Sequence, residues 1–341
     1  MDAAPEFIDL VPSTPTHPRT GEGDMVVLRD GTVFFAYTSF RQARDDALAD
    51  IACRTSSERG QSWTEPEILV SRDEARENVM SVSLLRLQSG AILLFYLRKD
   101  SRTVCRVWMR RSDDDAQSWS DAVCCTPGDD YYCIVNDCAV ELNDGRVLLP
   151  YSVCDEIWTP TERLLVATAC SDDEGASWHQ SNTVYAPKRG AMEPRAIERR
   201  DGTLWMLMRT DQGRIWQSTS DDRGNTWCEP SATQIEAPQA PFVLTRIPAT
   251  GDLLLIRNPV ANLTQGTHQG YRTPLASSIS RDDGATWTNE KLLESDTSHT
   301  YCYLSTTFID DLALLSYYAG HPGASLETLR IARVPVSWFY A

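Results

Sequence analysis

Acidic, tyrosine and arginine side chains recur at two kinds of position along the 341-residue chain. The first kind lies just before a strand that enters a tight turn, and its members are Glu22-Gly23-Asp24, Asn78-Val79-Met80-Ser81, Asn136-Asp137, Glu193-Pro194-Arg195, Gln239-Ala240-Pro241 and Tyr301-Cys302-Tyr303. The second kind lies just after the strand that leaves the turn, and its members are Arg41, Arg98, Tyr151, Arg209, Arg257-Asn258 and Tyr317-Tyr318. Carboxylates can move protons, and arginines bind anions bidentately. A single arginine is explained equally well by a structural ion pair, but the whole set favours a site that binds and transforms an anion.

Six tight turns must position these residues. Their central pairs are Asp30-Gly31, Ser89-Gly90, Asp144-Gly145, Asp201-Gly202, Gly251-Asp252 and Asp310-Asp311, which follow one another at intervals of 50 to 59 residues. Such pairs between strand-like segments predict β-hairpins whose two central residues both have positive φ. We call the segment around each hairpin a unit.

A second motif follows the first five hairpins. Its copies are SSERGQSW (56–63), SDDDAQSW (112–119), SDDEGASW (171–178), SDDRGNTW (220–227) and SRDDGATW (280–287). In this pattern Asp can accept hydrogen bonds from backbone N–H groups of its own turn, Gly supplies positive φ and Trp packs between sheets. The motif is an Asp-box turn.

A repeat of this length with about four strands predicts an all-β fold, a six-bladed β-propeller with Asp-box turns that forms a single domain over residues 1–341. The sixth unit has no Asp box and ends in TLRIARVPVSWF (328–339). We expect EFIDLV (6–11) to pair with that strand and close the ring. Hairpin turns and Asp boxes then share one face, and the first kind of position surrounds the channel mouth on the opposite face.

Asp boxes in a six-bladed propeller resemble the sialidase (neuraminidase) superfamily, and this resemblance extends over nearly the whole chain. It implies an exo-glycosidase that binds the carboxylate of a terminal acidic sugar with three arginines. Glu193 and Arg209, in EPRAIERRDGTLWMLMR, match one of these arginines and the acid that precedes it, and Arg272 matches a second. The third belongs to an R-I-P motif near the N-terminus, and this chain has no such motif there.

The resemblance leaves the third arginine open. Arg19 is the nearest candidate, but Glu22 and Asp24 follow it closely. Arg257 or Arg41 are the other arginines that we expect to complete an altered anion site.

The resemblance also implies a tyrosine nucleophile whose proton is taken by Glu193. Tyr301 and Tyr303, in HTYCYLSTTF, lie on one face of the matching strand, and both remain candidates. The acid/base residue is expected in the loop after the first hairpin, which contains Asp45, Asp46 and Asp50. We favour Asp46 from its distance to the first Asp box.

Other polar residues have weaker assignments. Asn78, Met80, Asn136 and Asp137 lie on the predicted rim, where they either read sugar substituents or cap strand ends. His268, His299 and His321 fall on loops of the same face, so a histidine-based mechanism remains an alternative. No spacing of His, Cys or carboxylates indicates a metal, and no motif indicates a cofactor.

The amino-acid composition restricts the classes of molecule that the protein can bind. With 32 Lys and Arg against 48 Asp and Glu, the net charge of −16 argues against nucleic acids and anionic membranes as partners and leaves a carbohydrate or glycoconjugate. The sequence shows no signal peptide and no apolar run of membrane-spanning length, which predicts a cytoplasmic protein, or a secreted one if a signal peptide was removed. We read the ten cysteines as mostly buried small hydrophobic residues, with a disulfide among Cys124, Cys125, Cys133 and Cys138 as the alternative.

The sequence therefore predicts an exo-glycosidase that removes a sialic, related ulosonic or uronic acid with retention of configuration. A propeller hydrolase or lyase of different mechanism is one alternative, and a carbohydrate-binding propeller without catalysis is the other.

Overall fold

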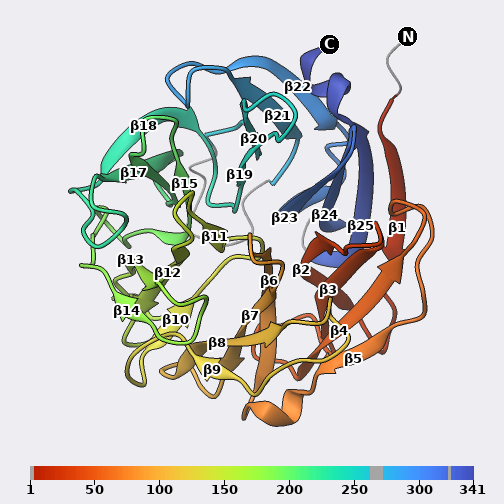
Figure 1. The fold of residues 1–341 in the computed structure, drawn as a ribbon, viewed down its shortest axis with the longest axis horizontal. Helices are drawn as coiled ribbons and strands as arrows, with labels where there is room; N and C mark the ends of the chain where they lie inside the picture. Colours follow the sequence, from red (N-terminus) through yellow and green to blue (C-terminus); the bar gives the residue numbers. More distant parts are fainter. Residues whose placement is uncertain (1–3, 262–271, 322–323) are drawn as a thin grey trace.

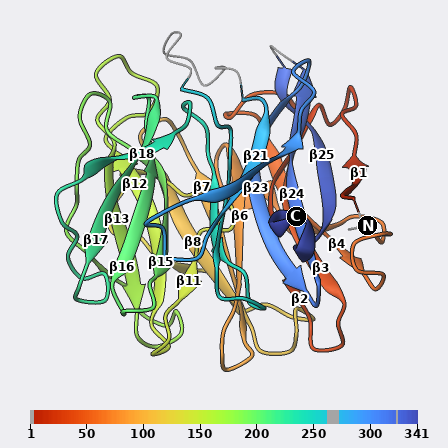
Figure 2. The same ribbon diagram turned by 90° about the horizontal axis from the view of Figure 1, so that it is seen from above.

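A computed structural model describes residues 4–261, 272–321 and 324–341. The described strands form five antiparallel or mainly antiparallel sheets arranged in a ring (Figure 1). One strand of each sheet lies near the centre of the ring and the others follow outward, with strands running roughly along the ring axis (Figure 2). The all-β propeller arrangement predicted from the sequence is confirmed.

Four of the sheets have four strands each. The first contains β2 (Arg19–Val27), β3 (Val33–Phe40), β4 (Ala49–Ser56) and β5 (Glu67–Val70). Two more contain β15 (Met192–Glu198), β16 (Leu204–Arg209), β17 (Arg214–Ser220) and β18 (Ser231–Glu236), and β19 (Val243–Arg246), β20 (Leu253–Arg257), β21 (Leu275–Ser280) and β22 (Thr288–Glu294). The last contains β1 (Glu6–Val11), β23 (Thr300–Ile309), β24 (Leu312–His321) and β25 (Ala324–Pro335). Two short 3₁₀ helices accompany them, η1 (Arg72–Glu74) and η2 (Val336–Tyr340).

The second and third units share one sheet of nine strands. Its strands are β6 (Asn78–Arg86), β7 (Ile92–Lys99), β8 (Cys105–Ser112), β9 (Val123–Cys124), β10 (Tyr131–Cys133), β11 (Val140–Glu141), β12 (Val147–Cys154), β13 (Leu165–Ser171) and β14 (His179–Gln180). A single parallel pair, Tyr131 with Cys105, joins β10 to β8. The prediction of six separate blades is therefore wrong, because the described residues form four separate blades and one sheet that spans two units.

Strand β1 closes the ring. It pairs antiparallel with β25 from Glu6↔Arg333 to Val11↔Leu329, as predicted from the sequence. Ile8, Leu10 and Val11 pack against the hydrophobic cluster between the first and last sheets. The pairing covers a sheet edge that would otherwise have free backbone groups.

All six predicted hairpin turns join the expected strands, but their backbone differs from the expectation. In the first, Leu28 N donates to Thr32 O at 2.7 Å and Gly31 N donates to Leu28 O at 3.0 Å. Only Gly31, with φ of 86°, has positive φ there. This pattern is a three-residue loop in which a type I turn is followed by a left-handed glycine, so the expectation of two positive-φ residues is wrong.

The Asp boxes form the turns expected of them. In the third box Ser177 N donates to Asp173 at 2.8 Å, and Gly175 N donates to Ser171 Oγ at 2.8 Å. The hydrogen bonds from the Ser118 side chain and backbone hold the pKa of Asp114 in the second box down at about 2. Gly175 has φ of 93°, a conformation that favours glycine, and a Cβ atom there would also displace the end of the flexible Met109 side chain, which it would meet at 2.5 Å.

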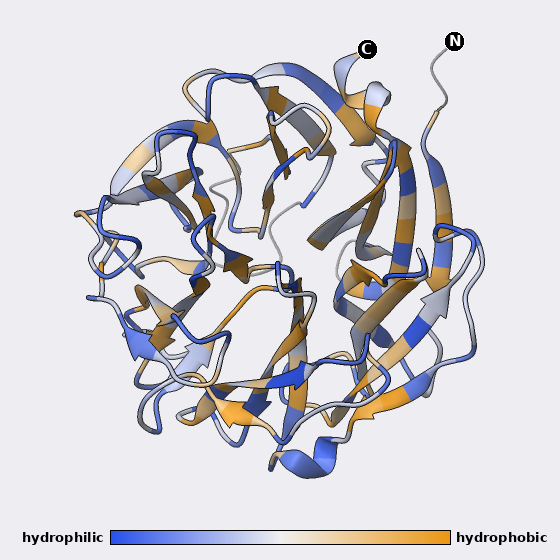
Figure 3. Cartoon of the chain, viewed as in Figure 1, coloured by the Kyte–Doolittle hydropathy of each residue, from blue (hydrophilic) through white to orange (hydrophobic). Residues whose placement is uncertain are grey.

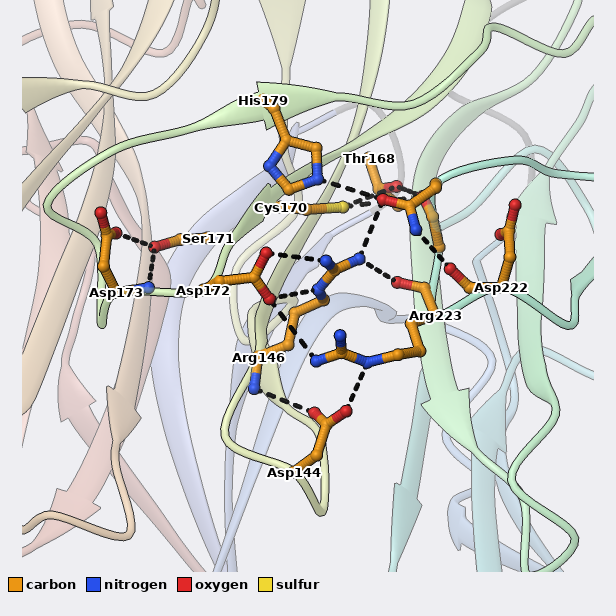
Figure 4. A network of polar contacts seen from close by, with 12 residues as sticks. Asp144, Arg146, Thr168, Cys170, Ser171, Asp172, Asp173, His179, Asp222 and Arg223 are labelled. Atoms are coloured by element: carbon orange, nitrogen blue, oxygen red, sulfur yellow. Dashed lines mark hydrogen bonds and ion pairs between the residues drawn. The ribbon is translucent and has the colours of Figure 1, made fainter.

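Arginines tie the Asp boxes to neighbouring units (Figure 4). Arg146, from the third hairpin, donates to both carboxylate oxygens of Asp172 at 2.7 Å. It also donates to Arg223 O at 3.0 Å and Asn225 Oδ1 at 2.9 Å in the next Asp box, while Arg223 forms an ion pair with Asp144. This face of the ring is therefore bound together by polar contacts and carries none of the predicted site residues.

Most of the hydrophobic residues lie on the strands, and many residues of the connecting loops are hydrophilic (Figure 3). The hydrophobic side chains form clusters between neighbouring sheets, the largest of which lies around β7, β8 and β12. All ten cysteines are free thiols, and Cys105 and Cys170 are buried among apolar side chains. Within the described ranges, no helix has the length and apolar character that a membrane crossing requires.

Candidate functional site

Five non-glycine residues near the centre of the ring have left-handed backbone conformations. They are Glu22 (φ 51°), Ser81 (57°), Asp137 (55°), Glu193 (49°) and Tyr303 (56°). Four of them lie at β-bulges, where the strand register shifts between Gly21 and Asp24, Met80 and Ser83, Met192 and Arg195, and Cys302 and Ser305. A bulge redirects its extra side chain, and left-handed residues of this kind concentrate at functional sites.

The four bulge residues line one cavity. Glu22, Ser81, Glu193 and Tyr303 face a space of about 50 Å³ together with Asp45 from the loop after β3. Ile157 and Trp158, in the loop between β12 and β13, form part of its wall. Three carboxylates and one phenol, contributed by three different sheets, therefore converge at one point.

Tyr303 and Glu193 form the central pair of the cavity. The Tyr303 hydroxyl donates to Glu193 Oε1 at 3.0 Å, and both residues come from innermost strands, β23 and β15. Burial, with a smaller contribution from the Glu193 carboxylate, raises the pKa of Tyr303 well above its ordinary value. The phenol is therefore neutral at neutral pH, and a carboxylate able to take its proton lies within hydrogen-bond distance.

Tyr301 has a different environment. Its hydroxyl donates to Asp296 O at 3.3 Å, and its ring lies edge-on to Tyr317, 6.2 Å between centroids. It does not line the cavity. Of the two predicted tyrosines, the structure brings only Tyr303 to Glu193.

Arg209 and Arg272 converge beside this pair. Both donate to the backbone carbonyl of Gln239, at 3.1 Å from Arg209 and 3.5 Å from Arg272. Arg209 also forms an ion pair with Glu193, and the Arg272 guanidinium lies 5.6 Å from the centroid of the Tyr303 ring. The Nε atoms of both arginines are buried without a hydrogen-bond partner in the described structure. Each guanidinium group therefore has one buried N–H that is unpaired among the described residues.

Arg19 is buried close by but is already paired. It donates to Glu22 at 2.5 Å, to Asp45, and to the Tyr318 hydroxyl at 3.1 Å, and its guanidinium lies 4.1 Å from the Phe40 ring centroid. Burial raises the pKa of Glu22, although Arg19 opposes this shift. Two carboxylates therefore offset the charge of this arginine.

The loop after β3 presents Asp45 and not Asp46 to the cavity. The backbone carbonyl of Asp45 accepts hydrogen bonds from Asn78 Nδ2 at 2.9 Å and Lys99 Nζ at 3.1 Å. Asp46 instead pairs with Arg44 at 2.8 Å, and this hydrogen bond lowers the pKa of Asp46. Asn78 thus holds the loop through the backbone of Asp45. The sequence-based preference for Asp46 as the acid/base residue does not fit this arrangement.

Several predicted residues lie away from the cavity. Arg257 contacts Glu236 O, Ser278 and Glu290 on outer strands, and Arg41 contacts His17 and Asp50. These contacts place neither arginine beside Arg209 and Arg272. The anion site is therefore not completed by either of them in this structure.

The carboxylates of Asp24 and Asp137 accept hydrogen bonds from backbone N–H groups. Asp24 accepts hydrogen bonds from Met25 N at 2.7 Å and Leu84 N at 2.8 Å, which ties β2 to β6. Asp137 accepts from Thr306 N at 3.0 Å and lies 3.5 Å from Arg195. Asp24 is buried and Asp137 is partly buried, and neither lines the cavity.

Neither His299 nor His321 lines the cavity. His299 pairs with Asp296 at 2.9 Å and its ring lies 4.6 Å from that of His321. His268 lies outside the described residues. In the described ranges, no group of three or more His, Cys, Asp or Glu side chains is placed to hold a metal ion.

Sequence reasoning placed Ser81 on the rim but did not assign it to the site, and it did not single out Trp158. Ser81 donates to Glu22 Oε2 at 2.9 Å. Ser81 lies at the same position before a hairpin strand as the assigned residues of other units, and this shared position could have identified it from the sequence. Trp158 lies in an irregular loop, for which the repeat gave no signal.

Comparison with known proteins agrees with this geometry. The model of the BNR repeat-like domain family matches residues 25–312. A comparison with curated protein sequences gave no match. One similar solved structure is a protein of unknown function from Dyadobacter fermentans, with 16% identity, a TM-score of 0.78, and coverage of 98% of this chain and 99% of that chain.

Two other similar solved structures are the Hadza microbial sialidase Hz136 and the sialidase of Trypanosoma rangeli. The first has 18% identity and a TM-score of 0.77, with 95% of this chain and 67% of that chain covered. The second has 15% identity and a TM-score of 0.73, with 98% and 60% covered. The TM-scores show that this chain shares the fold of these sialidases, and the family model spans most of the sequence. The chain therefore belongs to the BNR repeat-like domain family.

Proposed function

We propose that this protein is an exo-glycosidase that removes a terminal acidic sugar, a sialic acid or a related ulosonic or uronic acid, with retention of configuration. The observation that carries the proposal is the Tyr303 to Glu193 hydrogen bond of 3.0 Å beside two arginines that converge on one carbonyl oxygen. In the superfamily, a complex of the T. rangeli sialidase with 2,3-difluorosialic acid is described as a covalent intermediate. That description supports a covalent mechanism here.

The arginine pair binds the sugar carboxylate in the proposed reaction. Arg209 and Arg272 are charged at any working pH and can donate in parallel to two carboxylate oxygens. Gln239 O, which now accepts from both, marks where a ligand oxygen is favoured. Arg19 contributes less, because Glu22 and Asp45 already pair with it.

Tyr303 then acts as nucleophile. Its oxygen attacks the anomeric carbon while Glu193 takes the phenolic proton, and the bond from that carbon to the leaving-group oxygen breaks. Asp45 donates a proton to the departing oxygen. In the second step Asp45 takes a proton from a water molecule that attacks the same carbon, the bond from that carbon to the Tyr303 oxygen breaks, and Glu193 returns its proton to that oxygen. A neutral phenol suits an anomeric centre near a substrate carboxylate, because a carboxylate nucleophile would be repelled.

The cavity must open for a sugar to bind. Its volume of about 50 Å³ is far below the roughly 300–1,000 Å³ of typical small-ligand pockets. The wall formed by Ile157 and Trp158 belongs to a loop, whereas the other lining residues named here come mostly from innermost strands. We infer that this wall moves when substrate enters.

Hydrolysis of a fluorogenic aryl sialoside tests the proposal. We expect Tyr303→Phe to lower kcat by at least about 10³-fold, because the nucleophile is lost, and Tyr301→Phe to change it by less than about tenfold.

A second substitution tests the acid. On a sialoside with a poor leaving group, Asp45→Asn should lower kcat by about 10² to 10⁴-fold, and Asp46→Asn is its matched control. NMR of the first-formed product reports retention.

The results separate the alternatives. Undiminished turnover by Tyr303→Phe contradicts the covalent mechanism and points to a hydrolase or lyase of another kind. If Glu193→Gln changes only the affinity for a sugar and the wild type turns over neither sialosides nor uronides, the binding role is correct.

A further inference from the structure

At the four β-bulges around the cavity, backbone carbonyl groups lie outside the regular hydrogen-bond ladder. Two residues of each bulge oppose a single residue of the neighbouring strand, so the ladder is interrupted there. Carbonyl groups buried in this way need donors from elsewhere. Those that accept from a common group of donors near the centre of the ring are Gly23 O in β2, Val82 O in β6, and Tyr303 O and Leu304 O in β23.

Asn136 donates to two of these carbonyl groups. It lies in the loop between β10 and β11, and it is fully buried. Its Nδ2 atom donates to Gly23 O at 2.9 Å and to Tyr303 O at 3.2 Å. The backbone N–H of the next residue, Asp137, donates to Val82 O at 3.3 Å. Two adjacent residues of the third unit thus contact the bulges of three other units.

Arg195 connects the fourth bulge to the same two residues. It ends the bulge of β15, two residues after Glu193, and its side chain is buried. Its Nη2 atom donates to Asn136 O at 2.8 Å and to Leu304 O at 3.0 Å. Its Nη1 atom donates to the backbone carbonyl of Asp137. The strand of the proposed base and the strand of the proposed nucleophile are therefore joined through one arginine and one asparagine.

Asn136 and Arg195 contact the backbone of the bulges, and neither side chain lines the cavity. Tyr303 has φ of 56°, a conformation that is costly for a tyrosine and persists only where surrounding contacts impose it. The hydrogen bond from Asn136 to the Tyr303 carbonyl is one such contact, and the bond from Arg195 to Leu304 is another. Because the hydroxyl lies at the far end of a rigid ring, a small backbone change at Tyr303 displaces it from Glu193.

We propose that Asn136 and Arg195 are positioning residues, which keep the Tyr303 hydroxyl at hydrogen-bond distance from Glu193. They act through the backbone and do not touch the substrate. The inference rests on the proposed function for its effect on turnover, whereas the position of Tyr303 can be measured without any substrate.

Asn258 provides a matched control for Asn136. It is also buried, and its Nδ2 atom donates to two carbonyl groups, Pro274 O at 2.9 Å and Tyr301 O at 3.3 Å. Within the described structure, the Oδ1 atoms of both asparagines are buried without a hydrogen-bond partner. Asn258 thus makes the same kind of contact to the same strand, but to a tyrosine that does not line the cavity.

Steady-state hydrolysis of the aryl sialoside gives the first test. We expect Asn136→Ala to lower kcat by about 10 to 100-fold and to change KM by less than about threefold, because the substrate contacts remain while the nucleophile is misplaced. Asn258→Ala should lower the melting temperature about as much as Asn136→Ala does, but should lower kcat by less than about threefold. Equal losses of kcat in the two variants overturn the proposal.

Arg195→Lys keeps the test valid if Asn136→Ala does not fold. A lysine retains the positive charge beside Asp137 but cannot donate to three carbonyl groups in the geometry of a guanidinium fork. We expect the same loss of kcat with little change in KM. Unchanged kcat in this variant shows that Arg195 does not position the nucleophile.

Crystal structures of the same variants provide a readout that does not depend on turnover. In Asn136→Ala, or in Arg195→Lys if the first does not fold, the Tyr303 hydroxyl should lie beyond hydrogen-bond distance of Glu193, whereas in Asn258→Ala this hydrogen bond should remain. An unmoved Tyr303 overturns the positioning role even if the wild type hydrolyses sialosides. A displaced Tyr303, together with a wild type that hydrolyses no sialoside or uronide, rejects the proposed function and supports the positioning role.

Discussion

Tyr303 and Glu193 meet because of their backbone and not through long flexible side chains. Each has positive φ at a bulge of an innermost strand, and the side chains end 3.0 Å apart. A non-glycine residue in this conformation costs about 1 kcal/mol or more, which the surrounding sheet must offset. The pair is therefore positioned before any ligand arrives, as a nucleophile and its base require.

Asp137 gives a pH dependence at the residue scale. Burial raises the pKa of Asp137 to about 6, although Arg195 and Thr306 N–H favour its charged form. Because the unfolded pKa is about 3.9, the folded protein binds more protons, and the stabilising contribution is complete below about pH 4 and lost as pH rises through 6. We expect Asp137→Asn to flatten the fall in the free energy of unfolding over this window, measured by urea unfolding at fixed pH values.

Asp121→Asn is the control for this experiment, because Asp121 is exposed. Asp24 and Arg195 are the charged groups that face Asp137, and burial also raises the pKa of Asp24 well above its ordinary value. An Asp137→Asn variant whose stability depends on pH as strongly as the wild type would show that Asp137 is not the group responsible.

The site residues differ in how far the sequence could predict them. Glu193, Arg209, Arg272 and Tyr303 lie in or next to regular strands, so their distance from a recognisable hairpin or Asp box determined their place. Arg257 and Arg41 were misplaced because side chains alternate along a strand, and a register error of one residue sends a side chain to the other face. Asp45 and Asp46 lie in an irregular loop, where no period distinguishes adjacent residues.

At the scale of elements, the Asp box combines a turn with a contact between sheets. Ser171 Oγ accepts from Gly175 N and donates to Asp173, both at 2.8 Å, and the serine is fully buried. Without the hydroxyl, the Gly175 N–H keeps its burial and loses its partner. The serine is thus as important to the turn as the aspartate that gives the motif its name.

We expect Ser171→Ala to lower the free energy of unfolding by about 1–3 kcal/mol, the cost of a buried unsatisfied donor. Chemical denaturation monitored by tryptophan fluorescence provides the measurement. Ser57→Ala is the comparison, because Ser57 is the exposed second residue of the first Asp box. Equal effects of the two substitutions would show that the hydrogen bond to Gly175 is not what stabilises the turn.

The sequence predicted the presence of each hairpin but not its loop type. An Asp-Gly pair is typical of both the two-residue turn and the three-residue loop. In the three-residue loop only the second residue of the pair must adopt positive φ. Gly31 meets that need with φ of 86°, and no side-chain pattern distinguishes the two loops.

At the scale of the whole molecule, the number of sheets departs from the number of units. The repeat predicted six sheets, because six hairpins are spaced evenly. Strand β10 is only three residues long and adds one parallel pair to β8, which joins two units into one sheet. Such a short contact between units leaves no trace in the hydrophobic pattern, so the sequence could not show it.

Closure by β1 predicts what its removal does. We expect deletion of residues 1–12 to lower the melting temperature and to cause association that increases with protein concentration, because the edge of β25 is then free to pair with another chain. Differential scanning calorimetry and light scattering measure the two effects. The double substitution Glu6→Gln with Asp9→Asn keeps the strand but removes the ion pairs with Arg333 and Arg330. If it has the full effect of the deletion, charge and not strand pairing closes the ring.

The left-handed bulges also limit how such a site can diversify. Each contributing strand presents one side chain toward the centre, so ligand preference changes by exchanging single residues while the scaffold stays constant. Positive φ is least tolerated by β-branched residues, and none of Glu22, Ser81, Asp137, Glu193 and Tyr303 is β-branched. Few residue types, most of them polar, are therefore tolerated at these positions. This restriction favours relatives that recognise different polar ligands over relatives that recognise apolar ones.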